Sequence, residues 1–206
     1  MIDVKMLAIV IVVVTAVVAV GYYLHTAPAQ GPVQEVDGIP VFKESCYHRI
    51  EIPEVGQVGV LLLDSDFNIQ TNPVWAGELL VKHDIETHDM FIAVTFVVDE
   101  DYCYVFREKM TVKPINFEII YADFDEKFIS LEEFIKNKKY ENEYIKMMIE
   151  DLKKTNGDIC MLGIMFKPTN TETGQEFRSG DIIKFKILWN GQELFRVEAP
   201  ISIRFD

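Results

Sequence analysis

Residues 182–197, IIKFKILWNGQELFRV, contain the strongest hairpin signal of the chain. Asn190-Gly191 separates two arms rich in β-branched and aromatic residues, Ile182–Trp189 and Glu193–Val197. Asn-Gly favours a two-residue type I′ turn, because both turn residues need a positive φ and these residue types accept it. The stretch therefore predicts an antiparallel β-hairpin near the C-terminus.

Further strand candidates lie on either side of this hairpin. They show period-2 alternation or short apolar runs rich in β-forming residues, and turn residues bound them. At this spacing they predict a mainly β domain over residues 41–206, an antiparallel β-sandwich of the Ig-like or jelly-roll type. The candidates are Tyr47–Ile52, Gly59–Leu63, Trp75–His83, Met90–Val98, a hairpin over Tyr102–Phe106 and Lys109–Val112, Ile115–Tyr121, Ile159–Phe166 and, after Pro200, Ile201–Phe205.

One segment departs from the β pattern and predicts a helical insert over residues 130–155. Ser130-Leu-Glu-Glu133 has the form of a capping box, and apolar residues then recur at helical spacing, in one helix or in two. The apolar face of the insert packs on the sheet in the simpler interpretation. In the alternative it binds a partner, and the candidate residues of that face are Phe134, Tyr144, Ile145 and Met148.

The N-terminal stretch MLAIVIVVVTAVVAVGYYL, residues 6–24, contains no charge and no proline. A helix rises about 1.5 Å per residue, so this stretch is long enough for the roughly 30 Å hydrocarbon core of a bilayer. We expect a single-pass signal-anchor helix, an inner flank over residues 1–5 and a tether over residues 25–40. The anchor residues expected to contact lipid are Met6, Leu7, Ile9, Ile11, Val14, Val18, Tyr22 and Tyr23.

The flanking charges predict the orientation of this anchor. Lys5 precedes it, whereas Glu35 and Asp37 follow it, which favours a C-terminal domain on the extracytoplasmic side. The alternative is a secretory signal peptide cleaved after Ala29, since Ala27-Pro28-Ala29 has the form of a cleavage site. The apolar stretch is longer than a usual signal-peptide core, and this favours the anchor.

Charge and cysteine content limit the partners and the chemistry. A formal net charge of -13 repels phosphates and excludes nucleic acid as a partner, but it fits cations, basic proteins or simple solubility. Cys46, Cys103 and Cys160 form no CxxC spacing. We expect buried strand cysteines, and a disulfide between two of them is the alternative for a domain outside the cell.

Asp64, Asp66 and Asn68 are candidate calcium ligands, because a calcium loop uses oxygen ligands at positions 1, 3 and 5. Ile69 and Trp75 stand where such a loop has Gly and Glu, so a polar loop is the competing interpretation. The charged segment 82–89, with His83 and His88, is interpreted as a hairpin connector rather than a metal site.

No catalytic motif such as G-x-S-x-G, a P-loop or H-E-x-x-H is present. We therefore expect a non-enzymatic protein with no catalytic residue and no bound cofactor, calcium aside. Its expected role is that of a structural or accessory subunit of a cell-surface, virion or membrane-protein assembly, with membrane lipid and other protein subunits as partners. The alternative is a calcium- or ligand-binding ectodomain of the sensor or adhesin kind.

Overall fold

The computed structural model describes residues 33–63, 77–98, 102–125, 143–155 and 158–205. The chain divides into two compact units, Met1–Gly31 and Pro32–Asp206, and every described residue belongs to the second. The predicted anchor over residues 6–24, with its lipid-contacting residues, lies outside the described residues. Neither helix of the described part is long and apolar enough to cross a membrane.

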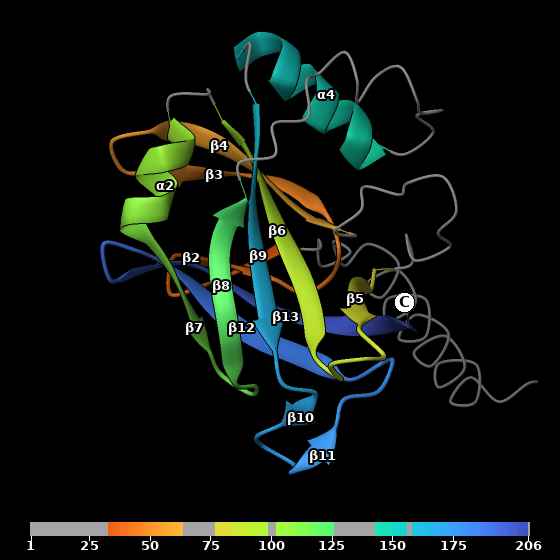
Figure 1. Cartoon of the computed structure of the whole chain (residues 1–206). Helices are drawn as coiled ribbons and strands as arrows, with labels where there is room; N and C mark the ends of the chain where they lie inside the picture. The colour runs from red at the N-terminus through yellow and green to blue at the C-terminus, as the bar shows by residue number, and fades with distance from the viewer. Residues whose placement is uncertain (1–32, 64–76, 99–101, 126–142, 156–157, 206) are drawn as a thin grey trace, which may run out of the picture. The chain divides into compact units, whose positions relative to one another are not determined.

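The described part of the chain is mainly β, with two helices (Figure 1). Its elements follow in chain order. They are β1 (Val33–Val36), β2 (Ile39–Phe42), β3 (Tyr47–Ile52), β4 (Gly56–Leu63), β5 (Leu79–His83), β6 (Met90–Val98), α2 (Cys103–Lys109), β7 (Met110–Pro114), β8 (Ile119–Asp125), α4 (Glu143–Thr155), β9 (Asp158–Phe166), β10 (Thr169–Asn170), β11 (Gln175–Glu176), β12 (Ile182–Trp189) and β13 (Gln192–Phe205).

The long strand β13 joins two groups of strands. In the first group the order is β1-β2-β13-β12-β7, and in the second it is β3-β4-β6-β9-β8. Strand β5 connects them, because it pairs with β6 and with Ile201–Phe205 of β13. Both groups contribute inward side chains to one apolar core, as in a β-sandwich: Phe96 of β6 lies 6.3 Å from Phe195 of β13, centroid to centroid.

Several strands predicted from alternation, apolar runs or β-forming composition are confirmed. The bounds of β3 and β6 match the predicted ranges, and β9 begins one residue earlier than predicted. The hairpin of β12 and β13 is also confirmed, with φ values of 50° at Asn190 and 79° at Gly191. Every second residue of β12 is buried, as expected for a strand with one face on the core.

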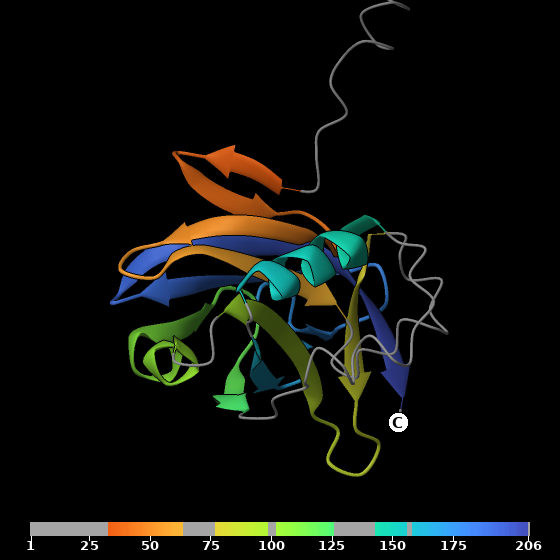
Figure 2. The ribbon, with the colours of Figure 1, turned by 90° about the horizontal axis from the view of Figure 1, so that it is seen from above.

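The predicted tether over residues 25–40 is wrong in its second half, which forms the hairpin of β1 and β2 (Figure 2). Asp37 and Gly38 make the turn, with φ values of 54° and 78°. Asp-Gly is the same type I′ signal as Asn-Gly, but Pro40 and the short arms obscured it. Pro40 is tolerated because β2 pairs with β13 only through Val41 and Phe42, so that ladder needs no N–H at Pro40.

The predicted hairpin over Tyr102–Phe106 and Lys109–Val112 is wrong in its first arm, because Cys103–Lys109 forms the helix α2. The second arm is confirmed as the strand β7, Met110–Pro114. Aromatic and β-branched residues suggested a strand, but tertiary packing decides in such a short segment. Phe106 is fully buried and contacts the rings of Phe96 and Trp189 at centroid distances of 5.4 and 5.7 Å.

The expectation of a purely antiparallel sandwich needs correction at β13, which runs parallel to both β2 and β5. Pro200 was expected to separate two strands, yet β13 continues through it. Proline has no N–H to donate, and here it stands where β13 stops pairing with β12 and begins to pair with β5. The strand β13 therefore changes its pairing partner at a residue that has no N–H to leave unpaired.

Helix α4 covers residues 143–155 of the predicted insert, and residues 130–142 lie outside the described residues. It packs on β3, β4 and β6 through Met148, Ile149 and Leu152, all buried. Met148 is 0% exposed, so its assignment to a partner-binding face is wrong. The same apolar spacing that serves a partner interface serves packing on a sheet, and the simpler interpretation holds for this residue.

Candidate functional site

A row of side chains crosses the sheet on the face opposite the core. Backbone register places Lys82 beside Phe91, Phe91 beside Met165, and Met165 beside Tyr121, on β5, β6, β9 and β8 in turn. The strand neighbours of Phe91 and Met165 are buried in the core, so these two side chains point the other way. We call Phe91, Met165 and Tyr121 the outer row.

The outer row is partly open to solvent. Met165 is 36% exposed and Tyr121 is 58% exposed, while Phe91 is half-buried. A Cβ built on Gly163 would lie 2.9 Å from the ring of Phe91, so the ring occupies the space above that glycine. Any larger residue at position 163 would displace Phe91 and break the row.

A cavity of about 360 Å³ adjoins the outer row at the turn between β5 and β6. This turn projects beyond the strands in Figure 2. Apolar surface predominates inside the cavity, and its apolar lining residues are Met90, Phe91 and Met165. Its rim carries charged residues, and those that matter for its chemistry are Lys82, Asp84, Glu86 and Asp89.

Hydrogen bonds to Asp84 hold the turn in shape. The Oδ1 atom of Asp84 accepts the backbone N–H groups of Glu86 at 2.8 Å and Thr87 at 3.0 Å. These bonds, first from Thr87 and then from Glu86, lower the pKa of the Asp84 carboxyl group. The carboxylate therefore stays ionised to a lower pH than an isolated aspartate does.

The other two acids of the rim differ in their surroundings. Asp89 lies 3.4 Å from Nζ of Lys167, and its side chain is only 18% exposed. Glu86 is exposed and forms no ion pair with another described residue. With three acidic residues and one basic residue, Lys82, the cavity lining carries a negative formal charge.

His83 and His88 flank this turn, with ring centroids 6.0 Å apart. The ring of His83 also lies 5.1 Å from that of Phe205, and its Nε2 atom is buried with no hydrogen-bond partner among the described residues. Within the ranges that the structure describes, no group of three His, Cys, Asp or Glu side chains is placed to hold a metal ion. The interpretation of residues 82–89 as a hairpin connector is confirmed by the pairing of β5 with β6.

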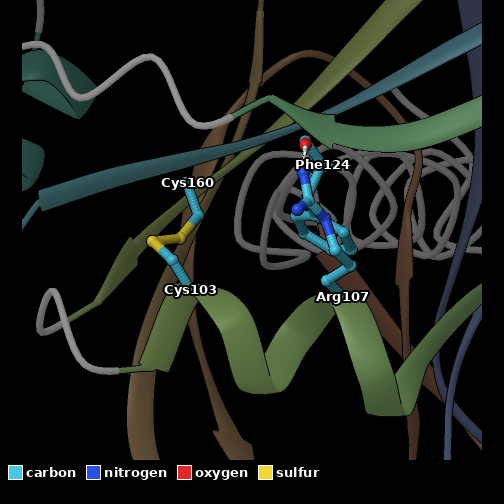
Figure 3. Close-up of a disulfide and its surroundings, with 4 residues drawn as sticks. All are labelled: Cys103, Arg107, Phe124 and Cys160. Atoms are coloured by element: carbon cyan, nitrogen blue, oxygen red, sulfur yellow. Dashed lines mark hydrogen bonds between the residues drawn. A yellow bond between two sulfur atoms is a disulfide. The ribbon is translucent and has the colours of Figure 1, made fainter.

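Helix α2 adjoins the edge of the sheet at β8 (Figure 3). Cys103 of α2 forms a disulfide with Cys160 of β9, and Nη2 of Arg107 donates a hydrogen bond of 2.7 Å to the carbonyl oxygen of Phe124. Oδ1 of Asp123 accepts the Phe124 N–H at 2.8 Å. The side chains of Arg107 and Asp123 thus satisfy a backbone C=O and a backbone N–H that would otherwise be unpaired at this sheet edge.

The predicted site residues have different outcomes. The candidate calcium ligands Asp64, Asp66 and Asn68 lie outside the described residues and stay a prediction, as does Phe134. Tyr144 and Ile145 belong to α4, but their side chains are outside what the structure describes. The outer row was missed because period-2 alternation shows which residues share a face of one strand but not which strands are neighbours.

Comparison with protein-family models, with curated proteins and with solved structures finds no match to this chain.

Proposed function

We propose that this protein is a membrane-tethered, non-enzymatic β-domain that holds a partner protein on the extracytoplasmic side of a membrane. In this proposal residues 6–24 are the anchor and residues 25–32 the tether. The domain, a sandwich of the Ig-like or jelly-roll type, presents the outer row to the partner as a structural or accessory subunit. The observation that carries the proposal is the outer row itself.

Three adjacent strands bring the outer row together, which distinguishes it from the single apolar residues that are scattered over most protein surfaces. Aromatic residues and methionine are enriched in protein interfaces, because they offer a large contact area. The row ends at β8, which among the described strands pairs with β9 alone. A partner can therefore approach it from the side as well as from above.

The edge of β8 favours contact through side chains rather than extension of the sheet by a strand of the partner. Arg107 and Asp123 engage the backbone of Phe124, as a guarded edge strand requires. Tyr121 remains largely exposed beside this guarded stretch, and its hydroxyl donates to Asp123 at 2.8 Å. Its aromatic ring is thus held in place without being covered.

The disulfide between Cys103 and Cys160 supports the proposed compartment. Disulfides form and persist in oxidising environments and are rare in the cytosol of most cells. An extracytoplasmic domain was expected from the charges on the two sides of residues 6–24, which is an independent argument.

Site-specific photocrosslinking in native membranes tests the proposal. A benzoyl-phenylalanine in place of Tyr121 in the full chain should give one adduct of defined mass. The same group at Ile182, which is 41% exposed on β12, serves as the matched control and should give none. Met165→Lys should abolish the Tyr121 adduct by placing a charge in the outer row, whereas Ile182→Lys should leave it intact. Equal adducts at both positions, or none at Tyr121, would overturn the proposal.

A further inference from the structure

We propose that the cavity at the β5–β6 turn receives a basic side chain, lysine or arginine, from the partner protein. This inference rests on the proposed function and names the chemistry that the partner must offer next to the outer row. The volume of the cavity, about 360 Å³, falls in the range of about 300 to 1,000 Å³ that is usual for ligand pockets.

The apolar wall of the cavity suits the stem of a long basic side chain. Lysine and arginine bury their methylene groups along apolar surface while the charged head stays at a polar rim. Phe91 and Met165 provide that surface. The ring of Phe91 packs over Gly163, which has no side chain to displace it. An aromatic ring adds attraction for a cation that lies over its face.

The acidic rim suits the charged head. One carboxylate oxygen of Asp84 accepts hydrogen bonds from two backbone N–H groups, so the position of this side chain is set before a ligand arrives. Glu86 is exposed at the rim and forms no ion pair with another described residue. Asp89 is largely buried beside Lys167. Among the described residues that line the cavity, Lys82 is the one basic residue, so the carboxylates outnumber it.

The charge of the whole chain acts in the same direction. A formal net charge of -13 attracts a basic surface over a distance and disfavours an acidic one. A cavity with an apolar wall alone would accept any apolar side chain of suitable size. The carboxylates of the turn make the cavity selective for a cationic side chain.

Methionine methyl resonances provide direct probes, because Met90 and Met165 line the cavity, whereas Met148 is a fully buried residue of α4. The full chain, labelled with ¹³C at its methionine methyl groups and held in detergent, is titrated with N-acetyl-lysine methylamide and with N-acetyl-arginine methylamide. The neutral N-acetyl-norleucine methylamide is the matched control ligand. We expect saturable shifts of Met165 and Met90 with both cations, much smaller shifts with norleucine, and an unchanged Met148.

A matched pair of variants tests the role of the rim. Glu86→Gln should weaken binding of the lysine probe about two- to fivefold, the change that corresponds to one exposed ion pair. Glu176→Gln, on β11 in a separate two-stranded sheet, should leave it unchanged. Equal shifts with norleucine, no shift at Met165, or an equal shift at Met148 would overturn the inference. If the Tyr121 adduct still forms after such a result, the proposed function stands and only the inference of a basic side chain in the cavity is overturned.

Discussion

The phenolic oxygen of Tyr47 donates a hydrogen bond of 2.6 Å to Oδ2 of Asp151, which joins β3 to α4 across 104 residues of sequence. Asp151 also accepts two hydrogen bonds from Arg49, at 2.6 Å from Nε and 2.8 Å from Nη2. Together with the buried Met148 and Leu152, these bonds hold α4 on the sheet.

We expect Tyr47→Phe to destabilise the protein by about 1 to 2 kcal/mol, because a partly buried carboxylate loses one of its donors. Urea unfolding of the full chain, followed by tryptophan fluorescence, measures the change. Tyr121→Phe is the matched control, since its hydroxyl also donates to an aspartate but lies at an exposed site. It should change the free energy of unfolding by less than about 0.5 kcal/mol. Equal effects of the two substitutions would contradict the proposed role of the Tyr47 bond.

Gly59 lets the ring of Tyr47 reach Asp151. A Cβ at position 59 would lie 1.8 Å from the hydroxyl oxygen of Tyr47, so Gly59→Ala must displace the ring. We expect a loss of about 1 to 3 kcal/mol in the free energy of unfolding, as for other overpacked sites. In a Tyr47→Ala background the same substitution should cost much less, and a double-mutant cycle measures the difference. Additive effects would show that the two residues are not coupled.

The stability of the α4 attachment should depend on pH through Asp151. Burial raises the pKa of its carboxyl group, but hydrogen bonds from Arg49 and Tyr47 outweigh burial and hold the pKa below its usual range. The unfolded chain then binds more protons than the folded one as pH falls through about 4, so this contribution is present above that pH and is lost below it. Asp151→Asn should remove that part of the acid dependence, measured as unfolding free energy from pH 7 to pH 3. An unchanged slope would contradict the shift.

The three cysteines should differ in reactivity. Cys46 is fully buried, and burial, with the nearby Glu44, raises the pKa of its thiol to about 12, which leaves little thiolate at neutral pH. A maleimide mass tag should therefore add to no cysteine of the folded chain, to one after denaturation, and to three after denaturation with a reductant. Two tags on the denatured but unreduced chain would contradict the pairing of Cys103 with Cys160.

Removal of the disulfide should lower stability. Cys103 and Cys160 are 57 residues apart, and a loop of that length corresponds to about 4 kcal/mol in the chain-entropy model. The double variant Cys103→Ser, Cys160→Ser should show a loss of that order in urea unfolding under oxidising conditions. Cys46→Ala is a control that leaves the disulfide intact. A reductant should destabilise the native chain but not the double variant.

The sequence alone determined most of the strands and one turn. Alternation along β3 and β12 shows which residues are buried, because side chains of a strand alternate between two faces and one face meets the core. The apolar run of β6 is instead buried along almost its whole length. Asn190-Gly191 determined its hairpin, because the turn needs positive φ at both residues. The mainly β class follows from these local rules.

Only the tertiary structure decided how the strands are ordered and what their outer side chains form. The parallel pairs of β13, the bond from Tyr47 to Asp151 and the outer row of Phe91, Met165 and Tyr121 all join residues far apart in the chain. The helix α2 is local, but packing of its Phe106 on distant rings decided it. Local sequence preference indicates which face of a strand a residue occupies. Which strand lies next to it depends on the packing that buries the most apolar surface over the whole domain. The physical reason is that burial is a property of the assembled core, whereas periodicity is a property of each segment.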